Sequence, residues 1–291
     1  MSSKHGLLAA LLALFALAAC RQAEPARPAL WQVEGPGGQR AWLFGTIHAL
    51  SRPVAWRSPA IDAALNKSDR VVLEVARIDD QTALEQIFAR LGAAPRSQPL
   101  RSRIAPGARA AFDRYVDHYD VDAAPLDRLD TWAAAIVLAQ AAQAASGSDS
   151  GNGVDRAVAK LAGSRPIDEF EGADGQFRTF DALPEADQRD LLAAVVADPA
   201  AVGSETRRLE QAWMTGDLAA IEAETRTGMM ADRELRTALL LDRNRAWTAR
   251  LVAMLTQGQR PFVAVGAAHL AGPDGLPAML TSQGYRVTRI Q

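Results

Sequence analysis

Two histidines occur in the same short pattern, more than two hundred residues apart. The segments "WLFGTIHAL" (42–50) and "FVAVGAAHL" (262–270) each place Gly-x-x-His after an apolar run, so that His48 and His269 both follow a predicted strand. Open α/β sheets build their sites at the carboxyl ends of strands. Glycine directly after a strand allows a sharp turn or the close approach of another group. The pattern therefore predicts that both imidazoles face one cleft above the sheet.

Glu74 is the third candidate residue, in the continuous apolar and β-branched run "RVVLEVA" (70–76). Such a run is typical of a strand buried on both faces, where a carboxylate must be paired, hydrogen-bonded or metal-bound. Two imidazoles and one carboxylate are the ligand set of several hydrolytic metal sites. His48, Glu74 and His269 are thus candidate catalytic residues and candidate ligands of a divalent ion (Mn, Co or Zn), with Glu74 as ligand or as general base.

Simpler interpretations remain open for each of these residues. A histidine after a strand can be an ordinary core or loop residue, and Glu74 can form a salt bridge with one of the many arginines. In a further variant, His48 or His269 acts as a metal-free general base. His118, in "YVDHYD", lacks any comparable context and is interpreted as a surface or structural residue.

Polar residues in the helical part are candidates for substrate binding. In "LDRNRAW", Arg243 and Trp247 are four residues apart on one helix face, and Asn244 lies on the adjacent face. Arg243 can bind a substrate carboxylate or carbonyl, or pair with Glu74 when no metal is present. The alternative is a surface arginine over a packed tryptophan. Asp155, in "GVD", is a weaker candidate that can cap or orient a helix.

The elements that must position these residues lie near both ends of the chain. Segment 40–46 is a predicted strand, 58–68 a helix beginning at Ser58 and Pro59, and 70–76 a strand; this βαβ order favours a parallel sheet. Segments 260–266 and 285–290 are predicted strands, separated by a helix at 274–284. From about 80 to 257 nearly everything has helical periodicity. We therefore expect an α/β fold with a parallel or mixed sheet, formed by both ends around a large helical insertion.

The N-terminal segment indicates export. A short cationic start, the apolar run "GLLAALLALFALAA" and Cys20 predict a signal peptide over 1–19. "LAAC" resembles the bacterial lipobox, in which the cysteine is lipidated; the alternative is a plain signal peptide with an incidental cysteine. We expect a tether over 20–29 and a single domain over 30–291. Arg21 replaces the aspartate that commonly retains lipoproteins in the inner membrane, which favours the periplasmic side of the outer membrane.

Composition and the motifs that do not occur exclude several classes of protein. The net charge is −2 without any block of like charge, which argues against nucleic-acid binding and a polybasic membrane surface. The sequence has no His-Glu-x-x-His, Walker or Gly-x-Gly-x-x-Gly motif, which argues against an ordinary zincin and against NTP or dinucleotide binding. The loop "GSDSG" (147–151) lacks the order of a nucleophile elbow.

The ordered motifs "FGTIH", "VLEV", "GVDRAVAKLAG", "FEG", "WMTGDL", "LLLDRNRAW" and "FVAVGAAHLAGPDGLPAMLTSQGYRV" resemble the TraB/GumN family, relatives of the Tiki metallopeptidases, over about 30–290. The resemblance implies an erythromycin-esterase/ChaN-like α/β fold. It also implies a metal-dependent peptidase site, which matches His48, Glu74 and His269. The family commonly has Leu-Glu-Thr at 170–172, where this chain has Phe-Glu-Gly, and Glu171 is a further candidate for substrate binding.

Two hypotheses about function follow. The first is a metal-dependent hydrolase that acts on peptides or another small-molecule substrate. The second is a non-catalytic envelope lipoprotein, held to the membrane by its lipid anchor alone, that binds a periplasmic ligand or partner through the same cleft.

Overall fold

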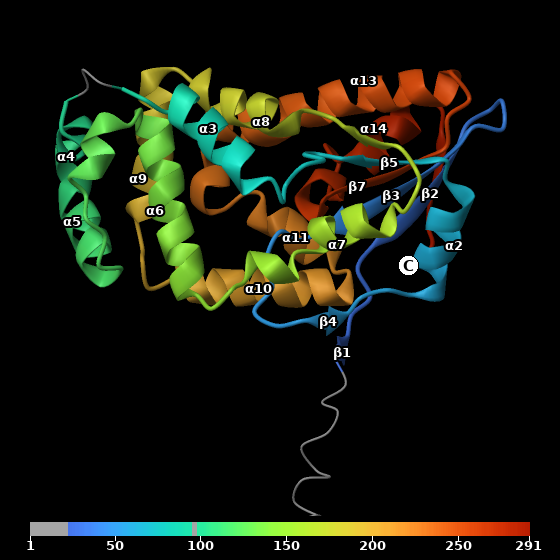
Figure 1. The fold of residues 1–291 in the computed structure, drawn as a ribbon, viewed down its shortest axis with the longest axis horizontal. Helices are drawn as coiled ribbons and strands as arrows, with labels where there is room; N and C mark the ends of the chain where they lie inside the picture. The colour runs from blue at the N-terminus through green and yellow to red at the C-terminus, as the bar shows by residue number, and fades with distance from the viewer. Residues whose placement is uncertain (1–22, 95–97) are drawn as a thin grey trace, which may run out of the picture.

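The computed structural model describes residues 23–94 and 98–291, and its centre is a mixed six-stranded sheet (Figure 1). The strands lie in the order β6 (Ile167–Glu169), β5 (Arg70–Leu73), β7 (Pro261–Gly266), β3 (Arg40–Thr46), β2 (Leu30–Glu34), β8 (Arg286–Arg289). The four strands from β6 to β3 are parallel, whereas β2 runs antiparallel to both β3 and β8. The predicted α/β class with a helical insertion is confirmed.

Strand β7, from the end of the chain, lies between two strands from its beginning. Phe44 of β3 pairs with Ala264, and Val72 of β5 pairs with Val263. The predicted unit of β3, α2 (Pro59–Lys67) and β5 therefore has its two strands joined through β7. Neither end of the chain can complete this sheet alone.

Helices cover both faces of the sheet, because its central strands bury side chains on both sides. Helices α2, α7 (Val154–Leu161) and α10 (Val202–Thr215) pack on one face. Helices α13 (Asp242–Thr256) and α14 (Leu276–Ser282) pack on the other. Buried side chains of the strands alternate between the faces: Trp42, Phe44, Val71, Leu73 and Phe262 on the first, Leu43, Val72, Val263 and Val265 on the second.

The remaining helices form a second hydrophobic core beside the sheet, with the fully buried Trp132 and Leu138 among its residues. It includes α3 (Gln81–Leu91), α4 (Leu100–Arg103), α5 (Arg109–His118), α6 (Thr131–Ala145), α8 (Gly172–Asp181), α9 (Glu185–Val196) and α12 (Arg233–Arg236). In Figure 1, α4 and α5 lie at the end of the molecule farthest from the sheet. Helix α11 (Leu218–Glu224) instead packs on the same face of the sheet as α2, α7 and α10.

Three details differ from the sequence-based expectation. Strand β6 interrupts the middle segment that was expected to be helical; it has three residues, too few for a periodic pattern. Strand β2 was not predicted. The strand expected over 70–76 ends at Leu73, because the carbonyl of Glu74 accepts hydrogen bonds from the loop after β6. Glu74 therefore stands directly after the strand, at the edge of the sheet.

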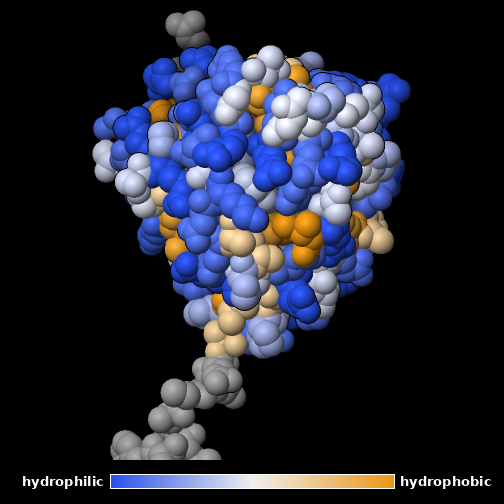
Figure 2. Space-filling view, turned by 90° about the vertical axis from the view of Figure 1, so that its right-hand side faces the viewer, coloured by the Kyte–Doolittle hydropathy of each residue, from blue (hydrophilic) through white to orange (hydrophobic). Residues whose placement is uncertain are grey.

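The N-terminal end of the described chain packs against the fold. Strand β1 (Glu24–Pro25) pairs with β4 (Val54–Ala55), so part of the expected tether is ordered on the surface. The predicted signal segment and Cys20 lie outside the described residues. Within 23–94 and 98–291, no helix is long and apolar enough to cross a bilayer. The side of the molecule that carries α2 is mainly hydrophilic, with small separate hydrophobic patches (Figure 2).

Candidate active site

The three predicted site residues meet at the carboxyl edge of the sheet. His48 follows β3, Glu74 follows β5, and His269 lies in the 3-10 turn η6 (Ala267–Leu270) after β7. A Cβ placed on Gly266 would lie 3.3 Å from Glu74 Oε1, 3.8 Å from His48 Nε2 and 3.8 Å from His269 Cδ2. Three parallel strands thus bring together side chains that are far apart in sequence.

The glycines of both Gly-x-x-His motifs are needed for close approach. Neither Gly45 nor Gly266 has a positive φ, so left-handed backbone is not the reason for glycine. A Cβ on Gly45 would lie 3.1 Å from the Cβ of Ala267, closer than side chains normally pack. A Cβ on Gly266 would stand among the three site residues. A methyl group at either position would require its nearest neighbour, Ala267 or Glu74, to shift by a few tenths of an ångström.

His48 is paired with Asp155, which lies in the first turn of α7. The Nδ1 atom of His48 is 2.9 Å from Asp155 Oδ2, so Nδ1–H donates to the carboxylate and Nε2 faces Gly266. The backbone holds this pair in place: Val154 N–H donates to the Ile47 carbonyl at 2.9 Å. Asp155 is buried, and its Oδ1 has no hydrogen-bond partner among the described residues. The sequence could not reveal this pair, whose members are 107 residues apart.

The surroundings of His48 favour its charged form. Burial opposes protonation, but the hydrogen bond to Asp155 and the charges of Asp155 and Glu74 raise the pKa of His48 to about 9. The side chain is 56 % exposed, so the carboxylates outweigh desolvation at this position. His48 is therefore an imidazolium at neutral pH and a comparatively strong base once it loses its proton.

Glu74 is buried and ionised. Its Oε1 accepts a hydrogen bond from Gly266 N–H at 2.7 Å, and its Oε2 accepts one from Arg243 Nη2 at 2.9 Å. Burial alone would raise the pKa of Glu74, but His269, His48, Arg243 and the Gly266 N–H together lower it to about 2. A carboxylate held in this way is a weak base.

His269 is buried and neutral, and its tautomer follows from Asn244. The amide of Asn244 donates from Nδ2 to the Asp274 carbonyl at 2.8 Å, so its Oδ1 accepts from His269 Nδ1–H at 2.6 Å. The lone pair of His269 Nε2 therefore points to Arg243 Nη1 at 3.2 Å. Burial, opposed by Glu74 and aided by Arg243, lowers the pKa of His269 to about 3.

Arg243 links Glu74, Glu171 and His269, and all five of its N–H groups are used. Nε and Nη2 donate to the two oxygens of Glu171 at 2.8 and 3.0 Å, and Nη2 also donates to Glu74. Nη1 donates to the Leu239 carbonyl at 3.1 Å and faces His269 Nε2. The predicted pairing of Arg243 with Glu74 is present. Direct binding of a substrate oxygen would require Arg243 to release one of these partners.

The loop after β6 supplies Glu171, and aromatic rings support the whole arrangement. Trp247 Nε1–H donates to Glu171 Oε1 at 2.9 Å, and its ring lies 4.6 Å from the Arg243 guanidinium and 5.1 Å from the parallel ring of Phe170. The N–H groups of Glu171 and Gly172 donate to the Glu74 carbonyl. Gly172 has a φ of +68°, a left-handed conformation that is strained for a residue with a side chain, and glycine at position 172 of this chain adopts it without strain.

A short π-helix, η5 (Thr237–Leu241), directly precedes Arg243. Such turns are rare and occur frequently at functional sites. Asn244, predicted to bind substrate, is fully buried and hydrogen-bonded to His269, which favours a positioning role. His118 is exposed on α5, where it contacts only Tyr119 among aromatic rings of the described chain.

A cavity of about 200 Å³ opens above these residues. Besides His48, Glu74, Arg243 and His269, its lining includes Thr46, Ile47, Gln176, Leu209 and Trp213. Leu209 is 37 % exposed, and Trp213 Nε1–H donates to the Gly45 carbonyl at 2.9 Å. Sequence reasoning missed these wall residues, because Gln176 and Leu209 stand on helices in patterns that carry no chemical signal.

The predicted metal ligands converge but do not form a coordination site in this arrangement. In the described part of the chain, no three histidine, cysteine, aspartate or glutamate side chains are placed to hold a metal ion. The guanidinium of Arg243 lies against both His269 Nε2 and Glu74 Oε2. An ion bound by these two atoms would have to displace it.

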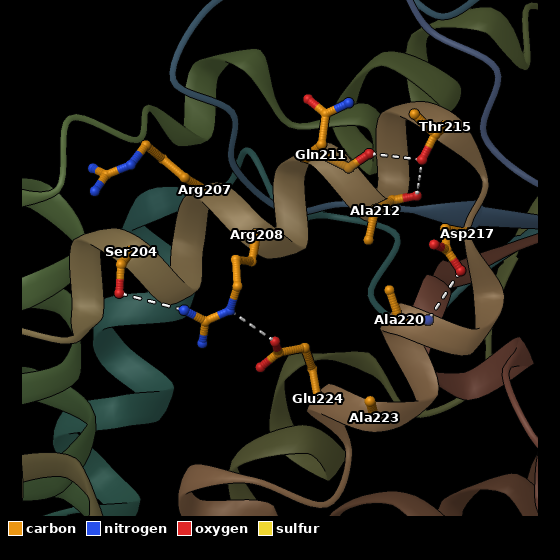
Figure 3. Close-up of a pocket in the computed structure, with 10 residues that line it drawn as sticks. All are labelled: Ser204, Arg207, Arg208, Gln211, Ala212, Thr215, Asp217, Ala220, Ala223 and Glu224. Atoms are coloured by element: carbon orange, nitrogen blue, oxygen red, sulfur yellow. Dashed lines mark hydrogen bonds and ion pairs between the residues drawn. The ribbon is translucent and has the colours of Figure 1, made fainter.

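A further hollow lies between α10 and α11 (Figure 3), with a volume of about 660 Å³. Three of its charged groups are used in local contacts: Arg208 pairs with Glu224 at 3.3 Å, and Asp217 accepts from Ala220 N–H at 3.0 Å to cap α11. None of the predicted site residues lines it.

The model of the TraB/PrgY/gumN family matches residues 29–289 of this chain. The chain belongs to this family. Two relatives, from Shigella flexneri and from Escherichia coli (strain K12), are each called "Uncharacterized protein YbaP"; each is 28% identical over 250 residues, which cover 84% of this chain and 89% of the relative. No solved structure matches the chain. The family resemblance is confirmed, and the matched region contains every site residue described above.

Proposed function

We propose that this protein is a hydrolase in which His48 transfers a proton between water and a peptide or ester substrate. One observation carries the proposal: the His48–Asp155 pair presents Nε2 to the cavity, opposite the buried cluster of Glu74, Arg243 and His269. This is the geometry of a base oriented by a carboxylate, as in other hydrolytic sites.

Each residue has a separate task in this proposal. Neutral His48 takes a proton from a water molecule between its Nε2 and Glu74 Oε1, and Asp155 stabilises the resulting imidazolium. The oxygen of the water attacks the substrate carbonyl, and the positive charge of Arg243 stabilises the oxyanion that forms. His48 then returns the proton to the leaving group. The apolar wall of Ile47 and Leu209 supports a substrate with an apolar group beside the carbonyl.

A metal-dependent hydrolase is the second candidate, favoured by the convergence of His48 Nε2 and Glu74 Oε1 beside Gly266. It would require Arg243 to leave His269 and Glu74. Arg243 could do so while it keeps both hydrogen bonds to Glu171. In the described part of the chain, these side chains are not arranged to hold an ion.

The test is hydrolysis of a panel of peptides and esters by the full chain, with and without chelator. We expect His48→Ala to lower kcat/KM on the order of 10²–10⁴-fold. The matched control His118→Ala, at an exposed position on α5, should leave it unchanged. Chelator should have no effect.

Two other outcomes would replace the proposal. Chelator-sensitive hydrolysis, with an equimolar ion that is lost in His269→Ala, would establish the metal-dependent candidate. If no substrate is cleaved while a ligand binds in the cavity, the protein is the non-catalytic envelope lipoprotein of the alternative hypothesis.

We also propose that Cys20 is lipidated and anchors the protein at the periplasmic face of the outer membrane. The signal-like segment before Cys20 and the residue Arg21 after it support this location. Labelled palmitate should be incorporated into the wild type and not into Cys20→Ser. Equal incorporation into both would refute lipidation, and recovery with the inner membrane would refute the location.

A further inference from the structure

A second hollow adjoins the site and has no part in the proposed chemistry. It lies between α3, α6 and α8 and has a volume of about 460 Å³, within the range of small-molecule and peptide pockets. Its lining includes the apolar side chains of Leu84, Phe88 and Phe177, the amides of Gln81, Gln140 and Gln143, and the charged groups of Glu85 and Arg156. We call this hollow the glutamine groove.

The glutamine groove and the site share the segments that form their walls. Asp155 faces His48, and the next residue, Arg156, lines the groove. Gln176 lines the site cavity, and the next residue, Phe177, lines the groove. Both hollows are therefore lined by the same two helices, α7 and α8.

The arginine that lies between the groove and the site is already paired. Arg156 forms an ion pair with Asp79, in the loop that leads from Glu74 to α3. In the same loop Ile78 lines the site, whereas Gln81 at the start of α3 lines the groove. Asp79 therefore neutralises Arg156, and the remaining charge in the lining of the groove is the exposed carboxylate of Glu85.

The chemistry of the groove suits a peptide segment with an aromatic side chain. Phe88 and Phe177 are partly exposed and meet edge to face at 5.5 Å, supported by Trp132 behind them. A further ring can pack against this pair. The side chains of Gln140 and Gln143 make no hydrogen bond to any described residue. Each offers a donor and an acceptor, as a peptide group does.

We propose that the glutamine groove is a substrate subsite for a peptide segment with an aromatic side chain, beside the bond attacked at His48. The role of the groove as a substrate subsite rests on the proposed hydrolase function. Peptide binding can nevertheless be measured without turnover, so the two ideas fail separately.

The experiment measures binding of capped hexapeptides to full-length His48→Ala protein by calorimetry. Two peptides differ in a single central residue, Phe or Gly, and the Phe peptide should bind roughly three- to tenfold more tightly. Phe177→Ala should remove this preference. Gln140→Glu, an exposed position on α6 where folding is not at risk, should shift the preference towards a peptide with Lys next to the Phe. Gln211→Glu, in the hollow between α10 and α11, is the charge-matched control and should change nothing.

Equal binding of the Phe and Gly peptides would overturn the subsite. So would a shift in the Gln211→Glu control as large as that in Gln140→Glu. If the expected preferences appear but wild-type protein cleaves no peptide, the hydrolase proposal fails and the groove stands as a peptide-binding site.

Discussion

The substitution Asp155→Asn tests the proposed role of His48 most directly. The Asn side chain retains an oxygen that can accept from His48 Nδ1–H but lacks the negative charge. Since Asp155 contributes both the hydrogen bond and the largest charge effect that raise the pKa of His48 to about 9, the variant should return towards the ordinary pKa of 6.5. At about pH 7, the neutral fraction of His48 would then rise from roughly 1% to roughly three quarters.

NMR titration of the imidazole nitrogens can follow this change, because the chain has only four histidines. In the wild type, His48 should remain charged until the pH approaches 9 and His269 neutral down to about 3. The signal of His118 is the internal control and should be the same in both proteins. The rising limb of the pH–rate profile should move down with the pKa of His48. A wild-type midpoint near 6.5, or a limb that stays near 9 in Asp155→Asn, would refute the reasoning.

Three further predictions concern the buried cluster. The pKa of His269 is about 3 in the folded protein and 6.5 when the side chain is exposed, so between these pH values unfolding takes up a proton. The free energy of unfolding should therefore fall by roughly 2–3 kcal/mol as the pH drops from 6.5 to 4.5. In chemical denaturation His269→Gln should lack this loss, and an equal loss in the variant would contradict the prediction. Arg243→Met should lower the free energy of unfolding by roughly 3–5 kcal/mol, because the buried carboxylate of Glu74 loses its cation. Arg245→Met, on the exposed side of α13, is the control. Equal effects of the two substitutions would reject the role of Arg243. Gly266→Ala places a methyl group among the site residues and should lower kcat/KM on the order of a hundredfold with little change in Tm. Unaltered kinetics would show that activity does not require the close approach of the site residues to Gly266.

Local pattern was sufficient for three central strands and for the three central site residues. The apolar runs around Phe44, Val72 and Val263 indicated strands buried on both faces, and each is a central strand of the sheet. Because parallel strands end at a common edge, the residues that follow them could be expected to meet. His48, Glu74 and His269 do meet there.

Local pattern was insufficient where a short element or a distant partner decides the geometry. Strand β6 has three residues, and its partner β5 lies almost a hundred residues earlier in the sequence. No periodic pattern therefore predicts it. It nevertheless brings Glu171 beside Glu74. The partnership of His48 with Asp155 likewise depends on how α7 packs on the sheet.

The sequence by itself determined the kinds of group at the site and the need for both ends of the chain to form one sheet, because buried strands and strand-end glycines are local properties. Only the tertiary structure decided the charges of those groups. His48 is charged, His269 neutral and Glu74 ionised because each pKa sums burial and neighbours from several elements. The tertiary structure also placed the guanidinium of Arg243 between His269 and Glu74. Its five N–H groups meet acceptors from four separate segments, and that convergence exists only in the folded chain.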